Sequence, residues 1–174
     1  MAAMDSQLEQ LKLSLESAVA AMSGEQLSWH PAGKWCAAEI LEHLFLTYTG
    51  TIKGFEKLVM SAKPLATRPS MRQRLRTFVV TGLSYMPEGR KAPTPSQPKG
   101  LAREMVLREI GGKMAAMDAI ITECEQRFGR RAPLLDHPIL GPLSAAQWRK
   151  FHAVHGRHHL KQILRLQTNQ KTEE

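Results

Sequence analysis

Four of the seven histidines of this 174-residue chain lie in the stretch FHAVHGRHHLKQIL, residues 151–164. The stretch has helical character, and successive residues of a helix turn by about 100°. His155 and His159 are four residues apart, so they project from the same face of that helix. Two imidazoles at this spacing can bind one metal ion. A buried bundle face would otherwise carry leucine and isoleucine, so the histidines indicate a site.

A metal site needs at least a third protein ligand, and His43 in the segment AAEILEHLFL can provide it. We therefore interpret His43, His155 and His159 as the metal ligands. The alternative is a set of core or surface imidazoles that are satisfied by hydrogen bonds, which is the usual role of a lone histidine. The stripe that holds the pair also carries Trp148, His152 and Gln162.

Other residues near these positions have ordinary structural explanations. His30 and His137 each precede a proline, which favours roles in turns or caps. Glu39 lies one turn before His43 and could support that histidine, act as a base or be a solvated charge. Cys36 could act as a nucleophile, but a small residue of the pocket or core is the simpler interpretation. No ligand role is assigned to His152 or to His158, which points to a neighbouring face.

The row of small and polar residues that contains His43 continues through Thr47, Gly50 and Gly54. Glycine within a helix costs roughly 1 kcal/mol relative to alanine. We interpret the row as the wall of a pocket with room for a bound molecule. The alternative is that the glycines only allow close helix packing.

Four long segments with helical periodicity must position these residues. They span about 6–22, with a capping box from Ser6 to Glu9, then 35–62, 100–128 and, after a cap at Ser144, 144–167. Between the second and third lies a long irregular segment, 63–100, with a short helix near 72–81. We find no strand alternation, no tight hairpin signal and no internal repeat. The sequence predicts an all-α four-helix bundle in one domain, 1–174.

Basic residues are concentrated in one part of the chain. The formal net charge is +8, and residues 63–91 carry seven basic side chains against the single acid Glu88: Lys63, Arg68, Arg72, Arg74, Arg76, Arg90 and Lys91. Such a segment can attract nucleic acid, anionic lipid or acidic small molecules, or it can be a solvated loop. The segment has few interleaved aromatic residues and matches no nucleic-acid-binding motif, which disfavours nucleic acid.

Several classes of protein are disfavoured by what the sequence lacks. No apolar run approaches the roughly 18 residues of a membrane span, so we expect no membrane partner. The first residues, MAAMDSQLEQ, do not resemble a signal peptide. Cys36 and Cys124 form no CxxC pair, which indicates reduced thiols in a cytoplasmic protein.

Two motifs resemble those of a known superfamily. HGRHHLKQI is similar to the C-terminal signature of the DinB/YfiT-like proteins, and KWCAAEILEHL is similar to their second-helix motif. HPILGPLSAAQWRKFHAVHGRHHLKQ resembles more specifically an uncharacterised branch, a domain of unknown function. The resemblance covers most of the chain, in the right order.

The resemblance implies an up-down-down-up bundle, often dimeric, with a metal site at His43, His155 and His159 that holds zinc or nickel. Relatives include transferases and isomerases that use mycothiol, bacillithiol or glutathione, and others are regarded as metal-dependent hydrolases. One departure is His152, which lies three residues before His155 where many relatives have a histidine four before.

These observations predict a metal-dependent enzyme that acts on a small-molecule substrate. An open three-histidine site can activate water or hold a low-molecular-weight thiol as its thiolate, giving a hydrolase or a thiol S-transferase. The basic segment could receive the carboxylates of the thiol. The alternatives are a non-enzymatic binding protein that uses the 63–91 arm for an acidic partner, and an inert descendant of an enzyme.

Overall fold

The four predicted segments form the long helices α1 (Ser6–Ala20), α3 (Ala37–Ser61), α5 (Arg103–Phe128) and α6 (Ala145–Glu173). The computed structural model describes residues 3–87, 89 and 91–173; Glu88 and Arg90 of the basic segment lie outside them. The shorter elements are α2 (Gly24–Ser28), α4 (Met71–Thr77), the π-helical turn η1 (Phe78–Gly82), the 3-10 turn η2 (Thr94–Ser96), β1 (Pro133–His137) and β2 (Gly141–Ser144).

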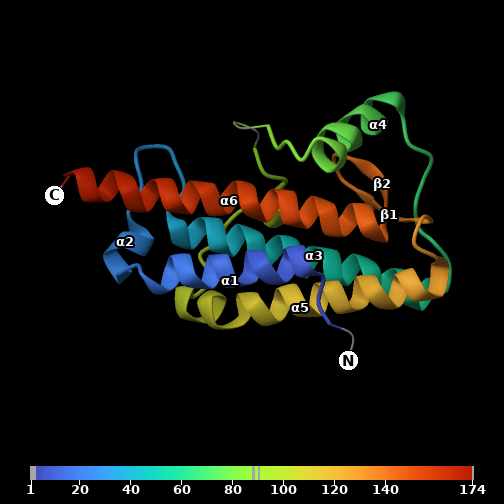
Figure 1. The fold of residues 1–174 in the computed structure, drawn as a ribbon, viewed down its shortest axis with the longest axis horizontal. Helices are drawn as coiled ribbons and strands as arrows, with labels where there is room; N and C mark the ends of the chain where they lie inside the picture. The colour runs from blue at the N-terminus through green and yellow to red at the C-terminus, as the bar shows by residue number, and fades with distance from the viewer. Residues whose placement is uncertain (1–2, 88, 90, 174) are drawn as a thin grey trace.

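The long helices are arranged as the predicted up-down-down-up bundle. In Figure 1, α1 and α6 run in one direction, and α3 and α5 run in the other. The most extensive pairings are α3 with α5 and α1 with α6. The all-α bundle and the long segment between α3 and α5 are therefore confirmed.

The bundle core follows the predicted helical spacing. Each long helix turns a stripe of apolar side chains toward the others, and burying such a side chain stabilises the fold by about 1.5–3 kcal/mol. The fully buried residues include Leu8, Leu41, Leu44, Tyr48, Phe55, Leu58, Met117, Ile121, Leu134, Leu143 and Ile163.

The cap of α1 differs from the one that the sequence predicted. Asp5, and not Ser6, caps α1: its carboxylate accepts hydrogen bonds from the backbone N–H groups of Gln7 and Leu8. The predicted capping box from Ser6 to Glu9 is therefore wrong. The predicted box required the Ser6 hydroxyl to accept from the Glu9 N–H, but this group donates to the Asp5 carbonyl at 2.9 Å, because the helix begins one residue earlier than that box requires.

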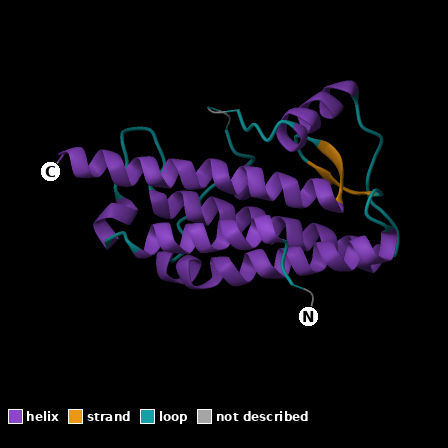
Figure 2. Cartoon of the chain, viewed as in Figure 1, coloured by secondary structure: helices purple, strands orange, loops and turns teal. Residues whose placement is uncertain are grey.

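The connector before α6 contains a hairpin that the sequence did not indicate. β1 and β2 pair in antiparallel fashion, with an irregularity between Pro133 and Leu135 (Figure 2). All four residues of β2 are buried, so this strand has no exposed face. Its sequence therefore lacks the alternation of apolar and polar residues by which a strand is predicted. The indole of Trp148 donates a hydrogen bond to the Leu135 carbonyl at 3.2 Å, which fixes the hairpin to the first turn of α6.

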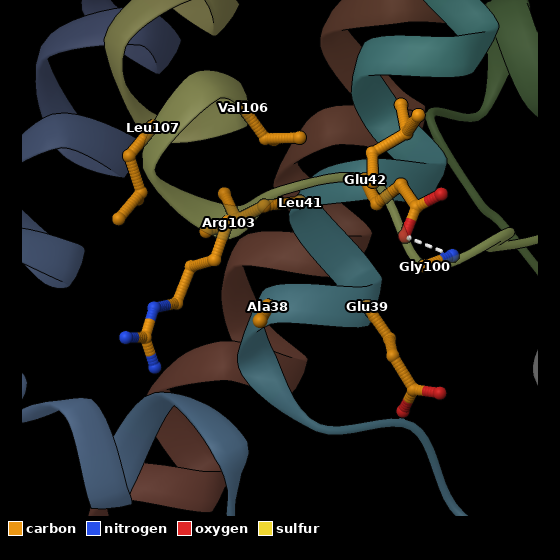
Figure 3. A pocket seen from close by; sticks show the side chains of 9 residues that line it. Ala38, Glu39, Leu41, Glu42, Gly100, Arg103, Val106 and Leu107 are labelled. Carbon is orange, nitrogen blue, oxygen red and sulfur yellow. Dashed lines mark hydrogen bonds between the residues drawn. The ribbon is translucent and has the colours of Figure 1, made fainter.

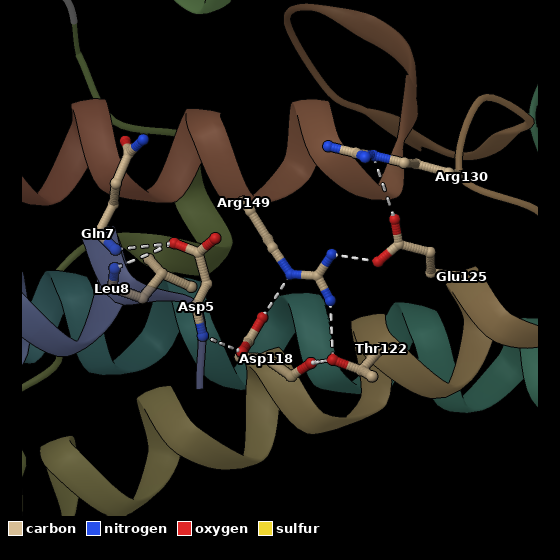
Figure 4. Close-up of polar contacts among 8 residues, drawn as sticks. All are labelled: Asp5, Gln7, Leu8, Asp118, Thr122, Glu125, Arg130 and Arg149. Atoms are coloured by element: carbon tan, nitrogen blue, oxygen red, sulfur yellow. Dashed lines mark hydrogen bonds and ion pairs between the residues drawn. The ribbon is translucent and has the colours of Figure 1, made fainter. Parts of the chain in front are cut away.

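A partly buried ion-pair network joins α5 to α6 and to the N-terminal segment (Figure 4). Arg149 donates from Nε to Asp118 at 2.6 Å, from Nη2 to Thr122 at 2.7 Å, and from Nη1 to Glu125. The backbone N–H of Asp5 donates to the other Asp118 oxygen at 2.8 Å. Each polar group of this network has a partner, as burial requires.

The predicted short helix near 72–81 is present as α4 and η1. Ser70 and Gln73 form a capping box at its start. The hydroxyl of Thr77 donates to the Leu140 carbonyl at 3.0 Å, which attaches this helix to the hairpin loop. No helix in the described part of the chain has both the length and the apolar character that crossing a membrane requires.

Candidate metal centre

The side chains of His43, His155 and His159 meet between α3 and α6. The Nε2 atom of His155 lies 3.1 Å from Nε2 of His43 and 3.1 Å from Nε2 of His159. One nitrogen from each ring lies within 4.8 Å of the other two. All three residues are buried, with exposed fractions of 4% to 9%.

Local sequence features bring the two helices to this meeting point. His155 and His159 lie on successive turns of one face of α6. Gly156, between them, faces α1: a Cβ atom there would lie 2.2 Å from Cδ2 of Leu11. The absence of a side chain at Gly156 therefore allows α6 to lie close to α1.

The start of α3 sets the position of His43. Cys36 caps this helix: its Sγ accepts from the Glu39 N–H, and the Glu39 carboxylate accepts from the Cys36 N–H at 2.9 Å. Glu39 is thus a capping residue, which was not among the roles considered for it. The ring of Trp35 lies 5.3 Å from that of His43.

Hydrogen bonds at Nδ1 fix the tautomers of His43 and His159. His43 Nδ1 lies 2.7 Å from the Ser96 carbonyl oxygen, and His159 Nδ1 lies 2.7 Å from Gln162 Oε1. Both oxygens can only accept, so each Nδ1 carries the hydrogen. In a neutral imidazole the other nitrogen then has a free lone pair. The Nε2 atoms of His43 and His159 therefore present lone pairs to His155.

Without a cation, this arrangement leaves a lone pair unsatisfied. His155 has one hydrogen at most on its Nε2, and it can donate that hydrogen to only one of its two neighbours. A metal ion would accept all three lone pairs. Two of the three separations, those of His155 from His43 and from His159, are 3.1 Å, close to the roughly 3.3 Å edge expected for tetrahedral zinc with nitrogen ligands. The residues present thus fit a metal ion.

Burial keeps the three imidazoles neutral. It lowers the pKa of His43, and it lowers the pKa of His159 to about 3. Burial, followed by the neighbouring His159 and His43, lowers the pKa of His155 well below its usual 6.5. Neutral imidazole is the form that binds metal ions, so the site needs no deprotonation at neutral pH.

His152 lies on the same helix face but belongs to a different environment. It is fully buried, and its Nε2 lies 3.1 Å from the Thr51 hydroxyl. Its ring contacts those of Tyr48, Trp148 and Phe151. It is not part of the three-histidine cluster, which answers a question that the sequence left open.

The segment of residues 96–100, from the last residue of η2 toward α5, crosses the start of α3 and is attached there. Glu42, 4% exposed, accepts from the backbone N–H groups of Lys99 at 2.6 Å and Gly100 at 3.2 Å. The next residue, His43, donates to Ser96 in the same segment. A backbone carbonyl partner such as that of Ser96 has no sequence signal, so this contact could not be predicted.

A small cavity lies beside this attachment, between α3 and the start of α5 (Figure 3). Its volume is about 180 Å³, and its lining is mostly apolar, with Glu39, Glu42 and Arg103 as its charged members. Ligand pockets usually measure about 300–1,000 Å³. This cavity is therefore smaller than a typical substrate pocket.

The remaining histidines have local hydrogen bonds. His30 Nδ1 lies 3.1 Å from the Pro31 carbonyl. His137 accepts from the N–H groups of Ile139 and Leu140, which confirms its predicted role in a turn. Nε2 of His158 lies 3.2 Å from Gln162 Nε2.

The predicted pocket wall on α3 is not what the structure shows. A Cβ atom on Gly54 would lie 2.6 Å from Cδ2 of Leu135, so Gly54 allows close packing of the hairpin. Gly50 is exposed to solvent with open space around it. Cys36 is a helix cap. The close-packing interpretation therefore holds for Gly54 alone, with the hairpin and not a helix as its neighbour, and neither interpretation holds for Gly50.

The sequence of the chain matches a known protein family. A family model described as protein of unknown function (DUF1569) matches residues 3–165. The chain belongs to this family. The prediction of an uncharacterised branch is thus confirmed. No curated protein matches the sequence.

The fold is similar to that of a solved structure. YfiT from Bacillus subtilis, described as a probable metal-dependent hydrolase with an unusual four-helix bundle topology, is similar with a TM-score of 0.61 and 18% sequence identity. The similarity covers 95% of this chain and 84% of that chain. At this identity it shows the fold, and it confirms the predicted DinB/YfiT-like architecture of the DUF1569 chain.

Proposed function

We propose that this protein is a metal-dependent enzyme whose His43, His155 and His159 hold a divalent ion, zinc or nickel, that activates water or a thiol cofactor. The observation that carries the proposal is the convergence of three neutral imidazole nitrogens, two of them with lone pairs fixed by hydrogen bonds. The description of YfiT as a probable metal-dependent hydrolase supports the same class of function.

A divalent ion bound by three neutral imidazoles supplies a Lewis acid with a coordination position left for a water or thiol. The chain's own residues hold the rings in place. Ser96 and Gln162 accept the Nδ1 hydrogens of His43 and His159, which orients both rings. The ring of Phe151 stacks on that of His155, with centroids 5.2 Å apart and planes at 12°.

The nucleophile in this proposal comes from outside the protein. Cys36 is the cysteine nearest in sequence to His43, but its sulfur accepts a hydrogen bond as the cap of α3. Burial also raises the pKa of this thiol, which disfavours the reactive thiolate. Water, for a hydrolase, or a low-molecular-weight thiol, for an S-transferase, therefore fills the role.

Metal content is the first test. We expect untagged protein to bind one equivalent of zinc or nickel when it is supplied, and the His43→Ala and His155→Ala variants to bind far less. His30→Ala is the matched control, since His30 is an exposed histidine that lies outside the cluster, with its Nδ1 beside the Pro31 carbonyl. The measurement is elemental analysis after gel filtration, with circular dichroism to verify folding.

The result that contradicts the proposal is a folded wild-type protein that takes up no ion, or one whose stoichiometry is the same in all variants. If the ion binds as expected, ester and amide hydrolysis and conjugation by thiols are the activities to assay. The cytoplasmic location and the dimer predicted from the sequence stay predictions.

A further inference from the structure

The outward face of α4 and η1 is apolar although it is turned to solvent. Met71, Leu75 and Phe78 are 78%, 65% and 58% exposed. Their spacing of four and three residues places them in one stripe along the helix. Leu83 and Tyr85, just after η1, are 62% and 59% exposed. Single exposed apolar residues are ordinary, but a contiguous set marks an interaction surface.

Polar contacts on the inward face hold this helix in the observed orientation. Thr77 donates to the Leu140 carbonyl, and the side chain of Gln73 packs directly on Gly141, where a Cβ atom would lie 2.7 Å from it. A helix on a protein surface usually buries its apolar face and exposes its polar one. Here the stripe of Met71, Leu75 and Phe78 faces outward because the fold fixes it there.

Positive charge flanks the stripe on both sides. At 100° per residue, Arg72 and Arg76 lie on one flank of the stripe and Arg74 lies on the other. All three are exposed, and none forms an ion pair with another residue in the described part of the chain. The surface therefore combines apolar side chains with uncompensated guanidinium groups.

The combination of exposed apolar side chains and guanidinium groups indicates which kind of partner surface can bind to this face. A second copy of the chain, meeting it face to face, would bring two sets of arginines together, which is unfavourable. A partner peptide would need a groove that takes in the whole stripe. The hollow beside α4 and η1 has a volume of about 420 Å³, and of the stripe it includes Phe78 but neither Met71 nor Leu75. An anionic bilayer accepts both features, because apolar side chains enter the acyl boundary while guanidinium groups bind lipid phosphates.

We propose that the α4–η1 face, meaning Met71, Leu75 and Phe78 with Arg72, Arg74 and Arg76, docks the protein on an anionic lipid bilayer. The sequence analysis expected no membrane partner because the chain has no spanning segment. Peripheral docking needs none, and the outward orientation of the stripe is visible only in the folded structure. The inference is independent of the metal centre.

Co-sedimentation with lipid vesicles tests this proposal. Wild-type protein is mixed, in the presence of a chelator, with vesicles of phosphatidylcholine alone or with about one third phosphatidylglycerol. We expect binding to the anionic vesicles only, and weaker binding at high salt. Two variants should each reduce the partition coefficient at least tenfold: Leu75→Ser with Phe78→Ser, and Arg72→Glu with Arg74→Glu and Arg76→Glu.

Two substitutions elsewhere serve as matched controls and should leave binding unchanged. Leu13→Ser removes an exposed leucine of α1, and Arg108→Glu reverses an exposed arginine of α5. The proposal is overturned if wild-type protein stays in solution with anionic vesicles. It is also overturned if the serine variant binds them normally, or if light scattering shows a wild-type dimer that the serine variant dissociates, since the stripe would then be an interface between copies.

Discussion

The amide of Gln162 links two histidines of the site region. Its oxygen accepts from His159 Nδ1 at 2.7 Å, and its nitrogen lies 3.2 Å from Nε2 of His158. The first contact keeps the hydrogen of His159 on Nδ1 and so leaves Nε2 free toward His43 and His155. A single neutral side chain thus determines the tautomer of one candidate metal ligand.

At the residue scale, we expect Gln162→Leu to lower metal affinity about 10- to 100-fold, because His159 loses the acceptor that fixes its tautomer. Competition with a chromophoric chelator measures the change. Gln162→Glu, which keeps an acceptor at this position, should restore tight binding.

Gln167→Leu on the same helix is the control, since Gln167 bonds to the Ala18 carbonyl and not to a histidine. Equal affinities for wild type and Gln162→Leu would mean that the Gln162 contact does not support the site.

At the element scale, the Arg149 network is the main polar connection between α6 and α5. The side chain of Asp118 is 3% exposed and has both the Arg149 guanidinium and the Asp5 N–H as partners. We expect Arg149→Ala to lower the free energy of unfolding by about 3–5 kcal/mol, because it leaves a buried carboxylate without its counter-charge. Urea unfolding monitored by circular dichroism measures this loss.

The exposed pair of Arg108 and Glu109 provides the comparison, and Arg108→Ala should change stability by less than about 1 kcal/mol. A similar small effect for Arg149→Ala would show that the network contributes little to holding α6 in place.

The long helices could be predicted from the sequence because their apolar residues repeat with helical spacing over many turns. The hairpin could not, since Leu134 and Leu143 are buried in strands too short to show alternation. The orientation of α4 also depends on a distant partner: Thr77 turns inward because the Leu140 carbonyl, 63 residues away, accepts its hydrogen bond. Local pattern carries no information about such contacts.

The site could be predicted in part for the same reasons. His155 and His159 share a face by helical spacing alone, and His43 was found as the third imidazole on another helix. The groups that hold the histidine rings in place differ in how well the sequence predicts them. Gln162 lies on the predicted stripe, whereas Glu42 and the Ser96 carbonyl act through a crossing segment whose path the sequence does not specify.

At the scale of the whole molecule, burial of neutral histidines makes the stability depend on pH. His137 illustrates this outside the metal centre, since burial lowers its pKa from 6.5 to about 4. Between these values the unfolded chain binds a proton that the folded chain does not bind. The free energy of unfolding therefore falls as the pH drops from about 6.5 to 4, and it is unaffected by this group above that window.

We expect this ring alone to account for a loss of about 3 kcal/mol across the window, from its shift of 6.5 to about 4. His137→Asn keeps an acceptor for the turn N–H groups but does not titrate. Urea unfolding at several pH values in the presence of a chelator should give a shallower acid loss for the variant. If the free energy of unfolding falls equally steeply with pH in the wild type and in His137→Asn, His137 is not the group that causes the acid loss.

The parallel direction of α3 and α5 has a consequence for the segment between them. After α3 ends, the chain must travel back along the whole bundle before α5 can start. A helix of 25 residues is about 37 Å long, a distance that roughly 11 extended residues can cover. Residues 62–102 greatly exceed that minimum. The topology requires a return path of about this minimum length. The residues beyond that minimum form α4 and the segment that crosses the histidines. Most of this stretch can therefore change in length and sequence without disturbing the four-helix bundle, whereas the part around Ser96 must keep its carbonyl beside His43.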